Sequence, residues 1–168
     1  RNRAAARTKI EGIIRRSGLS APLDVPVGRL SVGERQRVEI LKALYRDARV
    51  LVLDEPTAGL DPIGAAAFDQ LIVTLRNALG LTVFLVTHDL DTLYAACDRV
   101  AVLSQKRVLV ADSLDKVADT DDPWVQDYFH GPRGRAARRP GHRPGAARAA
   151  QQPTGPGGGR GAVRIGVQ

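Results

Sequence analysis

The chain has 168 residues, a formal net charge of +7 and one cysteine. That length allows one domain with a hydrophobic core, and a single cysteine excludes an internal disulfide and a cysteine metal cluster. No apolar run approaches the roughly 20 residues that span a bilayer. The excess charge lies in residues 131–168, which hold eight arginines and no acid, so residues 1–130 have a net charge of −1.

In chain order, the hydrophobic pattern predicts helices that alternate with strands. Two continuous apolar runs, residues 50–53 and 82–86, are typical of buried parallel strands. Between them, Asp61 and Pro62 provide a helix N-cap and first residue, and Gly80 ends that helix. This alternation favours an α/β layered fold. The other expected elements are helices at 4–16, 34–46, 89–97, 113–118 and 123–129 and a hairpin of strands at 99–103 and 107–110.

The last stretch, residues 131–168, is expected to be a disordered tail. Gly, Pro, Arg and Ala make up 30 of its 38 residues, so few side chains can bury apolar area to offset the entropy of ordering. Such a composition is also what a frame-shifted, GC-rich gene end encodes. The alternative is a polycationic arm for nucleic acid or anionic lipid. Because the tail has no aromatic ring to stack on bases, we do not expect a nucleic-acid partner.

Two adjacent acids, Asp54 and Glu55, directly follow the first apolar run. They therefore lie at the carboxyl end of a buried strand, where open α/β sheets bind ligands. Because adjacent side chains point in different directions, one carboxylate can hold Mg²⁺ while the other orients or deprotonates an attacking water. The alternative is that both acids are solvated turn residues.

A second candidate site is the start of the helix near residue 32. Ser31 and Gly33 place backbone N–H groups and a hydroxyl where they can face an anion, and Arg35 and Arg37 add positive charge. Ser31 and Glu34 also fit a capping box, which is compatible with an anion site.

A third candidate is His88, which follows the strand at 82–86 as Glu55 follows the strand at 50–53. Because the carboxyl ends of parallel strands lie together, His88 could reach the same ligand as Glu55. The alternative is a purely structural histidine.

Taken together, the motifs resemble the ATP-binding subunits of ABC transporters over about residues 1–130. They are, in order, Leu-Ser-Val-Gly-Glu-Arg-Gln at 30–36, Leu-Asp-Glu-Pro-Thr at 53–57, Gly-Leu-Asp-Pro at 59–62 and Val-Thr-His-Asp at 86–89. The resemblance implies a P-loop NTPase-like layered sheet, incomplete at the N-terminus. The commonest form of the family motif is Leu-Ser-Gly-Gly-Gln. In this chain Val32 replaces its first glycine and Glu34 its glutamine, whereas Ser31 and Gly33 are kept.

The resemblance also implies a role for each matching residue. Ser31, Gly33 and Gln36 belong to a signature motif that contacts ATP held by a partner subunit, and Asp61 belongs to a loop that couples two ATP sites. Asp54 is implied to support Mg²⁺. Glu55 is implied to be the catalytic base for the hydrolytic water, and His88 to sense the γ-phosphate of ATP.

At the level of the whole protein, the resemblance implies an ATP-hydrolysing subunit with ATP and Mg²⁺ as cofactors. Its expected partners are a second such subunit, in a head-to-tail dimer, and transmembrane permease subunits at the cytoplasmic face of a bacterial inner membrane. Residues 1–48 would then be part of a helical signature-motif subdomain, and residues 49–130 the C-terminal part of the catalytic core. The sequence holds no Gly-x-x-x-x-Gly-Lys-Ser/Thr loop, so we expect this chain alone to be inactive.

Different parts of the chain resemble different subfamilies. Residues 24–58 are similar to sugar and nucleoside importer ATPases, whereas residues 59–137 are similar to ATPases of Mla/Mce-type phospholipid transport. We interpret this as a junction of two sequences inside the shared Leu-Asp-Glu-Pro-Thr motif. The second match is longer, so we expect phospholipid transport. The alternatives are a sugar or nucleoside importer ATPase and a non-catalytic module with a basic tail that binds nucleic acid or lipid.

Overall fold

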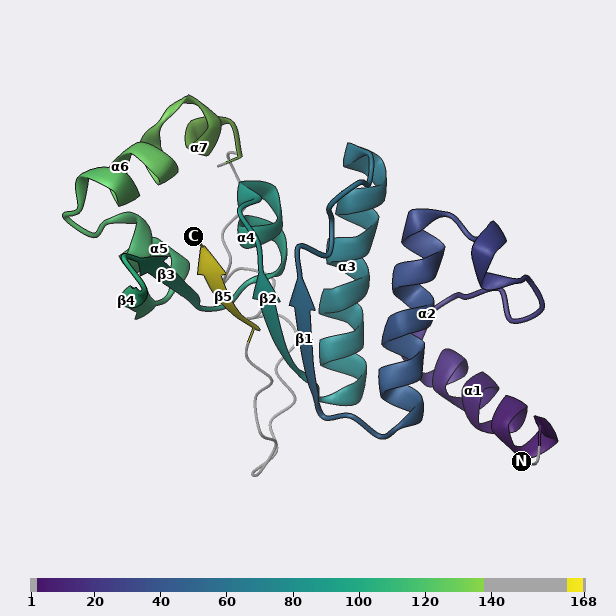
Figure 1. Cartoon of the computed structure of the whole chain (residues 1–168). Coiled ribbons are helices and arrows are strands. Elements are labelled where there is room, and N and C mark those ends of the chain that lie inside the picture. The colour runs from purple at the N-terminus through teal and green to yellow at the C-terminus, as the bar shows by residue number, and fades with distance from the viewer. Residues whose placement is uncertain (1–2, 138–162, 168) are drawn as a thin grey trace.

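One mixed sheet with the strand order β1-β2-β5-β3-β4 organises the computed structural model, which describes residues 3–137 and the backbone of residues 163–167 (Figure 1). From β1 through β2 and β5 to β3, each strand pairs in parallel with the next, and β4 pairs antiparallel with β3. The strands are β1 (Val50–Asp54), β2 (Thr82–Val86), β3 (Val100–Ser104), β4 (Arg107–Asp112) and β5 (Val163–Val167).

The helices confirm the predicted alternation, and every element predicted between residues 4 and 129 is present with ends that differ by at most two residues. Helices α1, α2 and α3 lie beside one another on the β1 side of the sheet (Figure 1). None of the helices in the described part of the chain has the length and hydropathy needed to cross a membrane. The helices are α1 (Arg3–Ser17), η1 (Val27–Arg29), α2 (Val32–Tyr45), α3 (Pro62–Leu79), α4 (Leu90–Ala96), α5 (Leu114–Ala118), α6 (Pro123–His130) and α7 (Pro132–Ala137).

Helix α3 has the caps that its sequence predicts. The Asp61 carboxylate accepts hydrogen bonds of 3.0 Å from the amides of Ile63 and Gly64, which lowers the pKa of Asp61. At the other end, Gly80 adopts φ 64°, a left-handed conformation that favours glycine. The helix ends therefore set the lengths of the loops that join α3 to β1 and β2.

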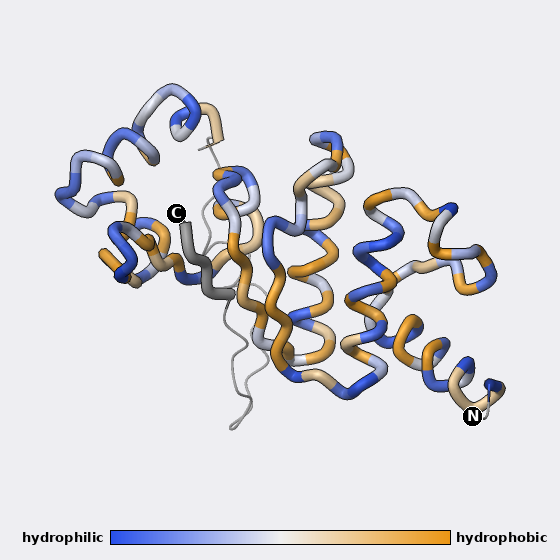
Figure 2. Tube along the Cα trace, in the orientation of Figure 1, coloured by the Kyte–Doolittle hydropathy of each residue, from blue (hydrophilic) through white to orange (hydrophobic). Residues whose placement is uncertain are grey.

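A single hydrophobic core joins the two predicted parts of residues 1–130. It includes Ile13 of α1, Leu41 of α2, Ile72 of α3, Val83 of β2 and Phe129 of α6, all at most 4% exposed. In Figure 2 strands β1 and β2 are mainly hydrophobic, and the chain becomes hydrophilic where β1 ends. The division at residue 48 stays a prediction.

Strand β1 differs from the prediction of a buried strand. Leu51 is buried, but Val50 and Val52 are 57% and 69% exposed. Side chains alternate along a strand, so Val50 and Val52 lie on the face of β1 opposite to Leu51, and that face is uncovered in the described part of the chain. Strand β2 fits the prediction better, because Val83 and Leu85 are buried and its other side chains are half-buried.

The expected disordered tail also differs from the structure in two places. Residues 132–137 form α7, which begins with Pro132, and residues 163–167 form β5 between β2 and β3. Proline suits the first turn of a helix. The sequence Val-Arg-Ile-Gly-Val alternates β-branched residues, which favour extended backbone, and β2 and β3 are not paired with each other. Residues 138–162 and residue 168 of the predicted tail lie outside the described residues.

A buried carboxyl group lies between α3 and α4. Asp69 is 4% exposed, and its Oδ2 accepts a hydrogen bond of 3.2 Å from the Thr92 hydroxyl, whereas its Oδ1 has no hydrogen-bond partner. Burial is the main cause that raises the pKa of Asp69 from 3.8 to about 6, and the charges of Asp89 and Asp91 add to it. The folded chain therefore holds this proton more tightly than the unfolded chain does.

This pKa predicts a pH dependence of stability. Between about pH 4 and 6 the unfolded chain loses the Asp69 proton while the folded chain keeps it, so stability falls as the pH rises through that window. The Asp69→Asn substitution removes this contribution. We expect the variant to gain roughly 1–3 kcal/mol relative to the wild type on going from pH 4 to pH 7, measured by urea unfolding. An equal pH dependence in both proteins would contradict the prediction, and the exposed Asp121→Asn is the control.

Candidate functional site

The carboxyl ends of β1 and β2 bring Glu55 and His88 into direct contact. The two strands are in register with Asp54 opposite Val86, and the Glu55 amide donates a 2.8 Å hydrogen bond to the Val86 carbonyl. His88 Nδ1 lies 2.8 Å from Glu55 Oε1. Because an ionised carboxylate only accepts hydrogen bonds, Nδ1 is assigned as the donor. The His88 side chain is 77% exposed and that of Glu55 is 36% exposed, so both can meet a ligand from solvent.

The backbone of Glu55 is in an unusual conformation. Its φ of 42° lies in the left-handed region, which is costly for a residue with a Cβ atom. The turn is closed by a hydrogen bond of 3.0 Å from the Ala58 amide to the Glu55 carbonyl. The chain thus turns sharply at the end of β1, and this turn directs the carboxylate of Glu55 toward His88. Strain of this kind is concentrated at functional sites.

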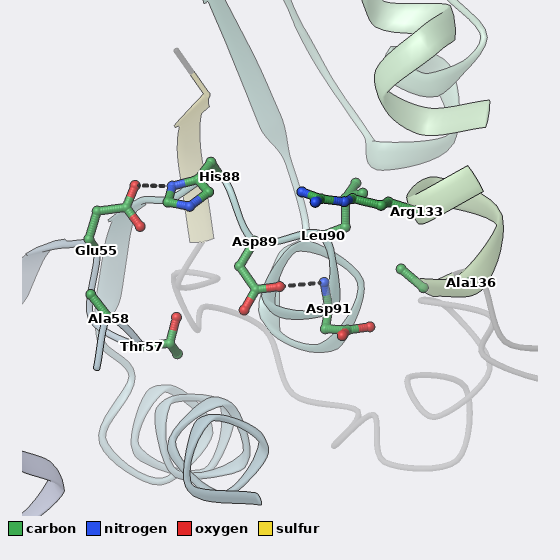
Figure 3. A pocket seen from close by; sticks show the side chains of 10 residues that line it. Glu55, Thr57, Ala58, His88, Asp89, Leu90, Asp91, Arg133 and Ala136 are labelled. Atoms are coloured by element: carbon green, nitrogen blue, oxygen red, sulfur yellow. Dashed lines mark hydrogen bonds and ion pairs between the residues drawn. The ribbon is translucent and has the colours of Figure 1, made fainter. Parts of the chain in front are cut away.

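An open hollow of about 600 Å³ lies beside this pair (Figure 3). Three segments far apart in sequence line it: the turn after β1, the loop from β2 into α4, and α7. In Figure 3 Glu55 and His88 lie on one side, and Arg133 extends from α7 toward Leu90. Asp89 caps α4 by accepting a 3.0 Å hydrogen bond from the Asp91 amide.

The charges in this hollow are mixed but mainly acidic. Glu55, Asp89 and Asp91 are carboxylates, and Arg133 is the arginine of its lining. Within the described residues, the guanidinium of Arg133 forms no ion pair or hydrogen bond with these acids. A polyphosphate entering the hollow would therefore meet more negative than positive charge, and it needs further cations or N–H donors to be held there.

A second hollow, of about 380 Å³, lies on the side of the pair that faces α2. Asp54 and Gln36 line it, and Glu55 lines both hollows. The Gln36 amide nitrogen donates to the Pro56 carbonyl, which ties α2 to the turn after β1. Gln36 Oε1 is buried with no hydrogen-bond partner. The two adjacent acids therefore share this second hollow, and Glu55 alone of the two also lines the first.

The remaining predicted site residues lie apart from the Glu55–His88 pair. Ser31 is the N-cap of α2, and its capping box with Glu34 is present as predicted, with the Glu34 carboxylate 2.8 Å from both the Ser31 amide and hydroxyl. These hydrogen bonds lower the pKa of Glu34. A Cβ atom on Gly33 would lie 3.6 Å from Leu60, so this helix start is next to the loop that contains Asp61. Ser31, Gly33 and Asp61 are not among the residues that line the two hollows.

Two residues of this region were not found by sequence reasoning. Arg133 was assigned to the tail, and Tyr128 lies in a short predicted helix to which no site residue was assigned. Tyr128 donates a 2.7 Å hydrogen bond to the backbone carbonyl of His88. The available signal was the pair of aromatic residues Trp124 and Tyr128 at positions i and i+4 after Pro123, which places both rings on one face of a helix.

Comparisons with known proteins agree on the family. A sequence model described as "ABC transporter" matches residues 1–58. The energy-coupling factor transporter ATP-binding protein EcfA3 of Clostridium perfringens is 38% identical over 111 residues, which are 66% of this chain and 39% of the relative. The ribose import ATP-binding protein RbsA 2 of Burkholderia ambifaria is 45% identical over 103 residues, or 61% of this chain and 20% of the relative.

A solved structure supports the same conclusion. The structure of cbiO1 from C. perfringens, described as part of the ABC transporter complex cbiONQ, matches with 33% identity and a TM-score of 0.61. The match covers 79% of this chain and 53% of the solved chain. The chain is therefore part of an ABC transporter ATP-binding domain, and its sheet and helices have the P-loop NTPase-like arrangement of that class. The chain spans about two fifths of the length of EcfA3.

The left-handed backbone conformation of Glu55 predicts how substitutions there affect stability. At a φ of 42° a glycine is favoured over alanine, so we expect Glu55→Gly to be more stable than Glu55→Ala by about 1 kcal/mol. Asp54, one residue earlier, is in a strand, and there glycine should be less stable than alanine. Urea unfolding of the four variants measures both differences. The same order of stability at both positions would show that Glu55 is not strained.

Proposed function

We propose that the chain provides catalytic residues of an ATP-hydrolysing subunit that powers an ABC transporter. The observation that supports this best is the contact of 2.8 Å between Glu55 and His88 at the carboxyl ends of two parallel strands, beside an open hollow. Ligands of open α/β sheets bind at this edge. Relatives of the chain belong to a family of ATP-binding transport proteins, which makes ATP the expected ligand.

The proposed chemistry uses the two oxygens of Glu55 differently. Oε1 accepts a hydrogen bond from His88 Nδ1–H, which orients the carboxylate. Oε2 accepts no hydrogen bond within the described residues, and it is the atom we assign to orient the attacking water and accept its proton. The Nδ1–H tautomer leaves His88 Nε2 free to meet the phosphate end of the nucleotide. The neutral imidazole accepts there, and a protonated one donates.

The proposed position for magnesium is Asp54. Its carboxylate is exposed at the end of β1 and lines the hollow next to Glu55. No group of three or more His, Cys, Asp or Glu residues in the described ranges is arranged to hold a metal ion. The Asp54 carboxylate is an oxygen ligand of the kind magnesium prefers, and it would hold an ion that arrives with the nucleotide. Bound in this way, the ion would neutralise charge on the phosphates.

The proposed partners are a second ATP-binding subunit and membrane permease subunits. Ser31 is exposed and Gly33 is half-buried at the start of α2, away from Glu55, so these residues are accessible to a nucleotide held by another subunit. The cbiO1 relative is described as part of a transporter complex, which supports an assembly with membrane subunits. We place the protein at the cytoplasmic face of a bacterial inner membrane on the same grounds.

The transported substrate has two candidates. A phospholipid is supported by the resemblance of residues 59–137 to Mla/Mce-type ATPases. A sugar is favoured by the RbsA 2 relative, whose name describes ribose import and which is 45% identical to this chain over 103 residues. Reconstitution with the membrane subunits distinguishes them, because one assembly would take up ribose and the other would move phospholipid between membranes.

The isolated chain is predicted to hydrolyse no ATP above background. Its sequence has no phosphate-binding loop, and none of its lysines (Lys9, Lys42, Lys106 and Lys116) follows the glycines that such a loop needs. A phosphate-release assay on the purified chain checks this. Sustained turnover that disappears in Glu55→Gln would contradict the prediction and show that another segment holds the nucleotide.

The Glu55→Gln substitution tests the catalytic base. In a chain joined to a phosphate-binding loop of the family, we expect it to lower turnover by at least about 10²-fold, since the amide cannot accept a proton. ATP binding should persist, so ATP-bound dimers should accumulate in size-exclusion chromatography. Asp121→Asn, an exposed acid outside both hollows, is the matched control. Unchanged turnover in Glu55→Gln would remove Glu55 as the base.

A further inference from the structure

The loop that carries His88 is held from its other side by a helix 40 residues away in sequence. The Tyr128 hydroxyl of α6 donates a hydrogen bond of 2.7 Å to the backbone carbonyl of His88. On the opposite side of the same residue, the imidazole contacts Glu55 at 2.8 Å. His88 is therefore fixed at two points, one on its backbone and one on its ring.

Helix α6 is built as a firm support for this contact. Its N-cap Asp122 accepts hydrogen bonds of 3.0 and 3.1 Å from the amides of Trp124 and Val125. Val125 and Phe129 are at most 1% exposed and anchor one face of the helix in the core. Their neighbours Trp124 and Tyr128 occupy the adjacent face. Because these two buried anchors are four positions apart on one face of the helix, the phenol has little freedom to move away from His88.

Two aromatic rings pack against Tyr128 and limit its movement. Trp124 stacks on it with the ring centroids 5.0 Å apart and an angle of 11° between the planes, and Phe129 meets it edge-on at 5.2 Å. Burial, with the charges of Asp89 and Glu55 nearby, raises the pKa of Tyr128 to about 12. The phenol therefore remains protonated, and remains a donor, throughout the range in which enzymes work.

The remaining contacts of the loop do not replace this one. Thr87, 1% exposed, accepts a 3.1 Å hydrogen bond from the Asp89 amide, and Asp89 caps α4. These contacts fix the residues on either side of His88. Neither of them reaches the His88 carbonyl, whose direction determines the plane of the peptide bond from His88 to Asp89.

We propose that Tyr128 is a positioning residue that holds His88 in the orientation in which its imidazole donates to Glu55. The proposal rests on the function proposed above for Glu55 and His88, but its test needs no hydrolysis. Without the phenol hydroxyl, the His88 peptide can rotate and the Nδ1–Glu55 contact is made for only part of the time. The proton on the neutral imidazole is then no longer confined to Nδ1.

The test is long-range ¹⁵N–¹H correlation spectroscopy of the imidazole in the full chain, which reports which ring nitrogen carries the proton. The signals of His88 are identified by their loss in His88→Gln. In the wild type we expect the Nδ1–H tautomer to dominate in alkaline buffer. In Tyr128→Phe the two nitrogen shifts should move toward each other as both tautomers become populated. Tyr45→Phe, which removes an exposed phenol on α2, should leave the His88 signals unchanged.

Two results would overturn the proposal. One is a Tyr128→Phe variant that is folded, as judged by its amide spectrum, but has His88 signals identical to those of the wild type. The other result applies if that variant does not fold, and it is measured on the wild type. Nuclear Overhauser contacts between the Tyr128 ring and the backbone protons of His88 or Asp89 would support the proposal, and their absence would overturn it.

The outcome is independent of the proposed ATP hydrolysis. If Glu55→Gln retained full turnover in a chain that binds ATP, the assignment of Glu55 as base would fail while the His88 tautomer still responded to Tyr128→Phe. If the tautomer did not respond but Glu55→Gln abolished turnover, the positioning role of Tyr128 alone would fail. The two measurements therefore separate the two proposals.

Discussion

Strands β1 and β2 run parallel with Asp54 opposite Val86, and the next amide along, that of Glu55, donates to the Val86 carbonyl. Because both strands end at this level, the turn after β1 and the loop after β2 begin side by side. The contact between Glu55 and His88 follows from this register. A shift of one residue in either strand would turn its side chains to the opposite face of the sheet and separate the pair.

The order of helices and strands was predictable because it depends on local signals. Asp61, Pro62 and Gly80 define the ends of α3 by chemistry that acts within a few residues. The proximity of Glu55 and His88 was also predictable, since the carboxyl ends of neighbouring parallel strands meet. The roles of these residues in hydrolysis stay predictions, as do those of Asp54, Ser31, Gly33, Gln36 and Asp61.

Other features depend on contacts between distant segments, and no local pattern contains them. Val50 and Val52 have the composition of a buried strand, but their exposure is decided by which strands and helices surround β1. Composition alone assigned residues 163–167 to a disordered tail, whereas an open position between β2 and β3 receives them as β5. The hydrogen bond from Tyr128 to His88 likewise joins residues 40 positions apart.

The capping box of α2 has a consequence for ligand binding. The Glu34 carboxylate occupies the amide and the hydroxyl of Ser31, which are the donors that a phosphate at this helix start would use. The sequence predicted that a capping box is compatible with an anion site, but in the folded chain a phosphate at these two donors would compete with the Glu34 carboxylate. Opening the box costs about 1 kcal/mol of helix stability. A nucleotide bound at Ser31 would therefore loosen the first turn of α2, and amide hydrogen exchange can detect that change.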